Sequence, residues 1–130
     1  MRKASSLLRL NHFEVSEKAR KVASLEAMIR EFENVAFDLA QQIAAEEQRT
    51  GNRDTKHVAY STFATAAASR RRNLLTSVAD LKSKLEAAKQ ELDEATRALR
   101  HLELAQRHFS ATDASAEGRF GVGANSPATL

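Results

Sequence analysis

The sequence predicts an all-α protein, a long antiparallel two-helix coiled-coil hairpin with a disordered C-terminal tail. Apolar residues recur every seven positions over two long stretches of the chain, and one short polar segment separates them. Helix-forming residues dominate the composition, and the 130 residues include only four Gly and one Pro. We expect residues 1–109 to form the hairpin. Residues 110–130 hold three of the four Gly, the one Pro and no periodic pattern, which predicts disorder.

The first helix is expected over about residues 4–49. One series of seam positions is apolar throughout and comprises Leu8, Val15, Val22, Ile29, Ala36 and Ile43. The companion series is apolar in the middle and polar at both ends, and it comprises Asn11, Lys18, Leu25, Phe32, Leu39 and Glu46. A sustained period of seven places both series on one helix face and predicts a left-handed supercoil.

The second helix is expected over about residues 55–109, where the repeat of seven returns. One series comprises Tyr60, Ala67, Leu74, Leu81, Ala88, Ala95, Leu102 and Phe109. The other comprises Ala64, Arg71, Val78, Leu85, Leu92, Leu99 and Gln106. Leu alternates with Ala across adjacent positions, which suits close contact between two helices.

A turn at about residues 50–54 is expected to join the helices. Gly51 can adopt the left-handed conformation that ends a helix, and Asp54 is a candidate N-cap for the next helix. Because the connection is short, the helices should be antiparallel neighbours, and paired residue numbers should sum to roughly 105. At about 1.5 Å per residue, the two arms should be on the order of 70 and 80 Å long.

The end of the second helix is predicted to bind a partner. With the expected pairing, the first helix runs out of partners near Leu99, while the apolar stripe continues through Leu102 and Phe109. Leaving these side chains in water would forgo about 1.5–3 kcal/mol for each large group that could be buried. A larger partner or a second copy could cover Leu99, Leu102 and Phe109. The alternative is a frayed helix end with incidental leucines.

Basic residues are concentrated around the expected turn. Residues 49–72 carry six basic side chains against a single acid, Asp54. The predicted basic tip comprises Arg49, Arg53, Arg70, Arg71 and Arg72. One interpretation is a solvated helix face, in which Arg71 lays its methylenes on the seam and lifts its guanidinium to the edge. The other is a contact with an acidic protein or an anionic lipid. DNA is less favoured, because no aromatic interleaving or groove-reading motif accompanies the charge.

The sequence offers no candidate catalytic, cofactor-binding or metal-binding residues, and we predict that the protein is not an enzyme. It has no Cys, which excludes thiolate metal sites and favours a reducing compartment. The four His fit no zinc-ligand spacing. The N-terminal MRKASSLLRLNHF starts like a signal peptide, but Arg9 and Asn11 interrupt its apolar stretch. A cytoplasmic protein is therefore expected.

Several segments resemble flagellar export proteins of the FliJ family. These segments are SLLRLNHFEVSEKARKVASLEAMI at residues 6–29, EEQRTG at 46–51, HVAYSTFATAA at 57–67 and RRRNLLTSVADLKSKL at 70–85. The likeness covers about residues 6–105. Heptads are shared by all coiled coils, so the more specific parts are RTG at the turn and AY followed by RRxNL.

The resemblance implies a soluble coiled-coil component of the bacterial flagellar type III export apparatus, similar to the central stalk of rotary ATPases. The implied partners are the hexameric export ATPase, the export gate membrane protein and the export chaperones. The implied location is the cytoplasm, with a peripheral position at the cytoplasmic face of the inner membrane. The terminal end of the rod would enter the opening of the ATPase ring, and the tip would contact the gate or the ATPase rim. The resemblance assigns no binding residues.

Two function classes remain as alternatives to flagellar export. One is a generic coiled-coil scaffold that forms homo-oligomers. The other is a rod that binds nucleic acid through its basic tip, with an affinity that falls steeply as salt is added.

Overall fold

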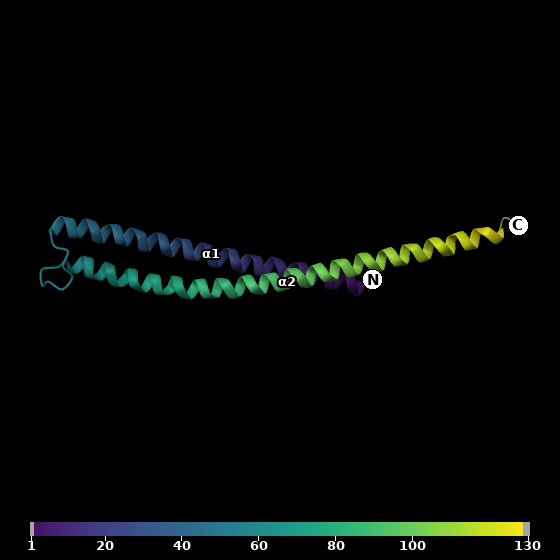
Figure 1. Cartoon of the computed structure of the whole chain (residues 1–130), viewed down its shortest axis with the longest axis horizontal. Helices are drawn as coiled ribbons and strands as arrows, with labels where there is room; N and C mark the ends of the chain where they lie inside the picture. The colour runs from purple at the N-terminus through teal and green to yellow at the C-terminus, as the bar shows by residue number, and fades with distance from the viewer. Residues whose placement is uncertain (1, 129–130) are drawn as a thin grey trace. The chain divides into compact units, whose positions relative to one another are not determined.

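The structure is a computed structural model that describes the backbone of residues 2–128 and the side chains of residues 3–112. It contains two helices, α1 (Arg2–Thr50) and α2 (Thr62–Ala128), joined by a loop (Figure 1). No strand occurs over residues 2–128. The prediction of an all-α helical hairpin is therefore confirmed.

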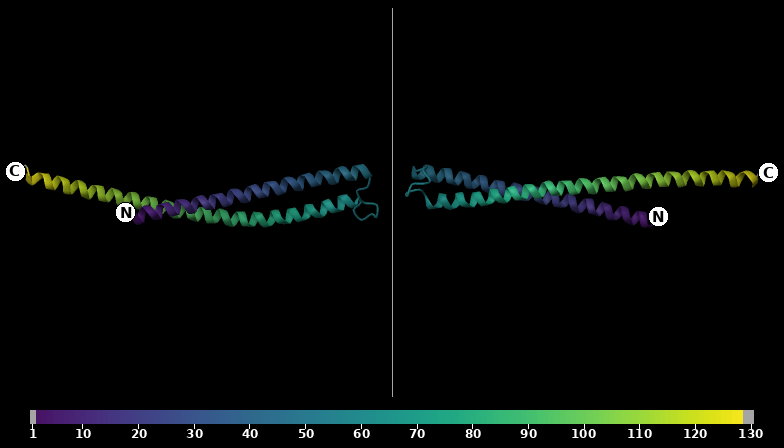
Figure 2. Two further views of the ribbon diagram at one scale, coloured as in Figure 1. Left: turned by 180° about the vertical axis from the view of Figure 1, so that it is seen from behind. Right: turned by 60° about the horizontal axis from the view of Figure 1, so that its bottom comes forward.

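The chain divides into two compact units, and each has its own packing. Unit 2 comprises Ala19–Gln90, and in it the loop connects two antiparallel helical segments. Unit 1 comprises Met1–Lys18 with Glu91–Leu130. In unit 1 the first turns of α1 lie along α2, and α2 continues past the N-terminal end of α1 (Figure 2).

The heptad series predicts the inward face of both helices correctly. Every series position from Leu8 to Glu46 is buried or half-buried, and so is every position from Ala64 to Gln106. Phe109, at the end of its series, is exposed. The core of unit 2 consists of Leu25, Ile29, Val78, Leu81 and Ala88, with Val22, Phe32 and Leu85 packed against them.

The loop is longer than the sequence pattern predicts. Gly51 ends α1 as expected, since its φ is 72° and its N–H donates to the Glu47 carbonyl at 2.9 Å. α2, however, begins at Thr62 and not near residue 55. Ser61 caps this helix by accepting a hydrogen bond from the Ala64 N–H at 3.2 Å.

The prediction that Asp54 caps the second helix is wrong, because polar loop side chains bond to nearby backbone instead. The Asn52 side chain accepts a hydrogen bond from the Asp54 N–H, and the Asp54 carboxylate accepts one from the Lys56 N–H, both at 3.0 Å. His57 Nδ1 accepts another from the Ala59 N–H at 3.0 Å. Such bonds to the residue two positions on favour turns over helix.

The longer loop shifts the pairing of the helices by about one repeat. Three cross-helix contacts, Lys18–Glu91, His12–Glu103 and Lys82–Glu33, have residue numbers that sum to 109, 115 and 115, against the predicted value of roughly 105. A shift close to seven residues leaves the same helix faces inward. The first helix therefore does not run out of partners near Leu99.

Residues 110–130 were expected to form a tail distinct from the hairpin, and the structure describes the backbone of this segment as far as Ala128. α2 remains helical from Ser110 to Ala128, where composition predicted no regular structure. The first part of this segment, SATDASAE, contains three Ala and one Glu, which are good helix formers. Extending an existing helix also avoids the cost of nucleating a new one. Side chains after Thr112 lie outside the described residues.

Candidate functional sites: a terminal groove and a polar tip

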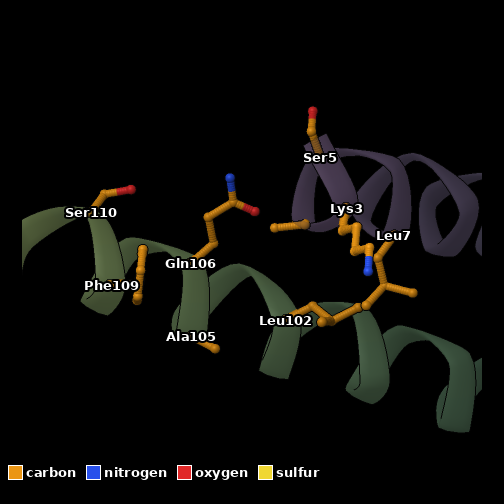
Figure 3. Close-up of a pocket in the computed structure, with 9 residues that line it drawn as sticks. Lys3, Ser5, Leu7, Leu102, Ala105, Gln106, Phe109 and Ser110 are labelled. Carbon is orange, nitrogen blue, oxygen red and sulfur yellow. The ribbon is translucent and has the colours of Figure 1, made fainter. Parts of the chain in front are cut away.

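Unit 1 contains an apolar groove between the first turns of α1 and the α2 segment that faces them (Figure 3). Its volume is about 750 Å³. The groove, called the terminal groove below, is lined by Lys3, Ala4, Ser5 and Leu7 of α1 and by Leu102, Ala105, Gln106, Phe109 and Ser110 of α2. Most of this lining is carbon, so the groove suits an apolar side chain better than a polar ligand.

The terminal groove exists because the seam in this part of unit 1 lacks large apolar side chains. Ala4 is small and Gln106 is polar, although both line the space between the helices. Leu7 and Phe109 border the gap and are 45% and 62% exposed. Two large apolar groups therefore remain in water beside an unfilled space, which is the usual setting of an interaction site.

The structure separates the three residues that were predicted to bind a partner. Leu102 and Phe109 both line the terminal groove. Leu99 is only 8% exposed, so it belongs to the packed seam and offers no free surface. Sequence reasoning missed Leu7, which it could have found as the residue before the Leu8 seam position at the start of the first helix.

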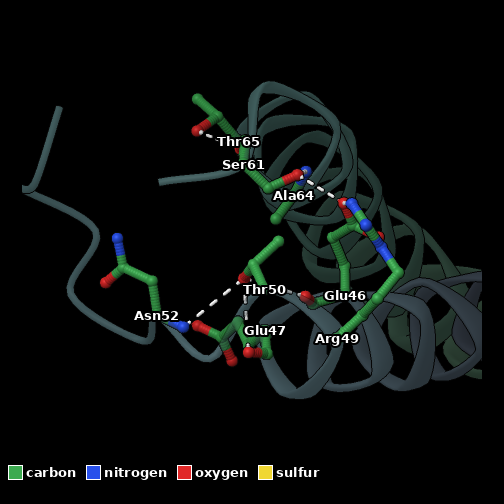
Figure 4. A network of polar contacts seen from close by, with 8 residues as sticks. All are labelled: Glu46, Glu47, Arg49, Thr50, Asn52, Ser61, Ala64 and Thr65. Carbon is green, nitrogen blue, oxygen red and sulfur yellow. Dashed lines mark hydrogen bonds and ion pairs between the residues drawn. The ribbon is translucent and has the colours of Figure 1, made fainter. Parts of the chain in front are cut away.

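A polar network ties the end of α1 to the beginning of α2 (Figure 4). The Arg49 guanidinium donates two hydrogen bonds to the Glu46 carboxylate, at 2.6 and 3.0 Å. Ser61 Oγ donates to Glu46 Oε1 at 2.9 Å. The Tyr60 hydroxyl donates to Glu47 Oε2 at 3.0 Å. These five residues, called the tip network below, join segments of the chain that flank the loop.

The tip network shifts the acidity of its members. Hydrogen bonds from Arg49 and then from Ser61 stabilise the carboxylate of Glu46 and lower its pKa. The same contact with Glu46 raises the pKa of Arg49. Burial raises the pKa of Tyr60, and the hydrogen bond to Glu47 adds to the rise. The contacts in the tip network therefore favour the ionised form of Glu46 and the neutral form of Tyr60.

The predicted basic tip divides into paired and unpaired cations. Arg49 is engaged by Glu46 in the tip network. Arg53, Arg70 and Arg72 are exposed, and none forms an ion pair within the described side chains. Arg71 is half-buried at its seam position, and its Nε is buried without a hydrogen-bond partner. Three arginines therefore remain available to bind an anion. Burial of the unpaired Arg71 Nε, in contrast, destabilises the folded protein.

Over residues 3–112, no three His, Asp or Glu side chains gather where they could hold a metal ion. Within the described residues, neither helix has an apolar run long enough to cross a membrane. No family model, curated protein or solved structure matches this chain.

Proposed function

We propose that this protein is a stalk-like component of the bacterial flagellar type III export apparatus, working with the export ATPase and the export gate in flagellum assembly. In this proposal it is a binding protein and not an enzyme. The terminal groove contacts the ATPase, and the exposed arginines near the loop contact an acidic partner at the export gate. Export chaperones are further partners, and the protein works at the cytoplasmic face of the inner membrane.

The observation that carries the proposal is the way in which the segments resembling the FliJ family meet in space. Glu46, Glu47 and Arg49 belong to EEQRTG, whereas Tyr60 and Ser61 belong to HVAYSTFATAA. Hydrogen bonds of 3.0 and 2.9 Å join these two segments in the tip network. The resemblance therefore includes residues that contact each other across the hairpin, which heptad similarity alone would not explain.

The terminal groove supports the ATPase contact. A stalk that enters a ring needs an apolar surface at its end, and Leu7, Leu102 and Phe109 supply one. Burial of such groups at an interface is the main source of binding free energy.

The test is a pull-down of the export ATPase with the Leu102→Asp and Phe109→Asp double variant. We expect binding to be lost, because two carboxylates would be desolvated in an apolar contact. Leu104→Asp is the matched control, since Leu104 is 53% exposed and does not line the groove. Undiminished binding by a double variant of normal helicity would contradict the ATPase assignment.

The arginines provide a second test, in living cells. Arg70→Glu with Arg72→Glu should reduce motility while leaving helicity intact, because both side chains are exposed and lack anionic partners in the described structure. Arg30→Glu with Arg100→Glu is the control, since it reverses two exposed charges outside residues 49–72. If cells with the Arg70→Glu and Arg72→Glu variant showed normal motility, these arginines would contribute only to solubility.

Two alternative functions, a self-associating scaffold and a rod that binds nucleic acid, predict different experimental results from the proposed function. The scaffold requires a stable dimer in light scattering together with no binding to the export ATPase. The rod requires binding to DNA that weakens steeply between low and physiological salt.

A further inference from the structure

Cations without an ionic partner surround the terminal groove. Lys3 lines the groove itself, and its amino group points from α1 toward α2 (Figure 3). Arg9 lies four residues after Ser5 and Arg107 three residues before Ser110, so each arginine shares a helix face with a residue of the lining. Lys3, Arg9 and Arg107 are exposed, and none forms an ion pair within the described side chains. We call these three residues the cationic rim.

The excess of positive charge is local to the groove. Residues 1–12 and 101–112 together carry four basic side chains against a single acid, Glu103. The carboxylate of Glu103 lies 3.9 Å from His12 Nε2. The next twelve residues of each arm, 13–24 and 89–100, carry six basic and five acidic side chains, which is nearly balanced. A ligand in the terminal groove therefore meets a positive field that the adjoining surface lacks.

The dimensions of the terminal groove suit an added helix. Its lining on α2 runs from Leu102 to Ser110, which is about 12 Å at 1.5 Å per residue. This length equals about two helical turns, so a helix laid along it presents two apolar side chains four residues apart. Leu7 and Phe109, which are 45% and 62% exposed, would become buried against those side chains.

A polar group inside the groove favours an occupant that carries carboxylates. Gln106 is half-buried among the lining residues, and its amide points away from α2 (Figure 3). It has no hydrogen-bond partner within the described residues. Its two N–H donors and the cationic rim can both be satisfied by carboxylate oxygens. A cationic occupant would be repelled by the rim.

Two other occupants fit the groove less well. A second copy of this chain would bring the same four-to-one excess of cations to the interface, and like charges there disfavour association. An anionic membrane would satisfy the charges. Its surface is flat on the scale of the groove, however, and would leave the space between the helices unfilled.

We propose that the terminal groove binds an acidic amphipathic helix. Two apolar side chains of that helix enter the space beside Leu102 and Phe109, and its carboxylates pair with Lys3, Arg9 and Arg107. Because the terminal groove is the proposed ATPase contact, this proposal rests on the proposed function. It adds the chemistry of the segment that the ATPase presents.

The binding test uses two synthetic helical peptides, each about three heptads long. Both carry two Leu four residues apart, and they differ in having Glu or Lys beside this apolar pair. We expect the full-length protein to bind the Glu peptide at least about tenfold more tightly at low salt. The preference should shrink as salt is added, because exposed charges are screened beyond about 10 Å at 0.1 M. Equal affinity for the two peptides, or no binding of either, would overturn the proposal.

The role of the cationic rim is tested by charge reversal. Arg9→Glu with Arg107→Glu should weaken binding of the Glu peptide about tenfold or more and should strengthen binding of the Lys peptide. Arg30→Glu with Lys84→Glu is the matched control, because it reverses two exposed cations of unit 2, and it should change either affinity less than about twofold. A rim variant of normal helicity that kept its preference for the Glu peptide would contradict the assignment.

The location is tested with two phenylalanines of equal exposure. Phe109→Ala should weaken binding of the Glu peptide about fivefold or more, because Phe109 lines the groove. Phe13→Ala should change it less than about twofold, since Phe13 is 61% exposed but lies outside the lining. Equal effects of the two substitutions would show that the peptide binds elsewhere.

The two other occupants are tested with Phe109→Ala and with vesicles. Phosphatidylglycerol vesicles should not displace the Glu peptide. Displacement by these vesicles but not by phosphatidylcholine vesicles would assign the groove to anionic lipid. Sedimentation velocity should give the same mass for Phe109→Ala as for the protein without substitution. Loss of a dimer in this variant would assign the groove to a second copy.

Competition with the export ATPase separates this proposal from the proposed function. We expect the Glu peptide to displace the ATPase and the Lys peptide to leave it bound. If the Glu peptide occupies the groove without displacing the ATPase, the ATPase assignment fails and the acidic helix belongs to another protein. If ATPase binding requires Leu102 and Phe109 but tolerates Arg9→Glu with Arg107→Glu, the ATPase assignment holds and the acidic helix is wrong.

Discussion

The core of unit 2 and the terminal groove of unit 1 follow the same heptad series but are filled differently. In unit 2 the seam holds Leu25, Ile29 and Leu81, and it is closed. In unit 1 the corresponding positions include Ala4 and Gln106, and a groove of about 750 Å³ opens between the helices. Periodicity thus determines which face points inward, whereas side-chain volume determines whether the space between the helices is filled.

The largest expected effect comes from removing the same side chain in the two places. Leu81→Ala should lower the free energy of unfolding by about 2–5 kcal/mol, because Leu81 is 8% exposed in the closed core. Leu102→Ala should cost less than half as much, because Leu102 borders space that is already open. Urea unfolding of both variants measures the difference. Equal losses would mean that the terminal groove is as well packed as the core.

A smaller effect is expected from the seam arginine. Arg71→Met removes a buried Nε that has no hydrogen-bond partner, so it should raise the free energy of unfolding by about 1–3 kcal/mol. Gln106→Leu replaces a polar seam residue beside the open groove, and the gain should be smaller. Thermal melts compare the two variants. A destabilised Arg71→Met protein would show that the guanidinium has a favourable partner in solution.

The smallest effect should be a pH dependence confined to the tip network. The pKa of Glu46 is lowered in the folded protein from its ordinary value of 4.5, mainly by the hydrogen bond from Arg49. The stability that this carboxylate contributes is therefore fully present above pH 4.5 and is lost as pH falls through the lower folded value. Glu46→Gln should remove that part of the acid sensitivity, measured as melting temperature against pH. An unchanged acid profile would mean that Glu46 titrates normally.

The buried face was predictable because it depends on a repeating pattern. Positions such as Ile29 and Val78 recur every seven residues, and a pattern repeated so often is insensitive to local detail. The start of α2 was not predictable in this way. It depends on bonds that Asn52, Asp54 and His57 make to backbone two residues on, and each is a single local event.

The pairing of the helices could not be inferred from periodicity. Lengthening the loop from the five residues predicted to eleven brings Lys82 beside Glu33 without changing which side chains face inward. The predicted site was affected by this shift. Leu99 gained a packed environment and became buried, while Leu7 came to border the groove with Phe109. Only the length of the loop, which sequence patterns predict poorly, distinguishes the two pairings.

The contacts between the two arms of the hairpin also differ in how far apart their residues lie in the sequence. Tyr60 and Glu47 are 13 residues apart, whereas His12 and Glu103 are 91 residues apart. Loop-closure entropy rises with the number of residues enclosed, so folding should begin beside the loop and proceed toward the termini. The terminal groove would then form last and open first, and its amide hydrogens should exchange before those of the unit 2 core. A ligand in the groove would therefore slow unfolding, because the hairpin must begin to open where that ligand is bound.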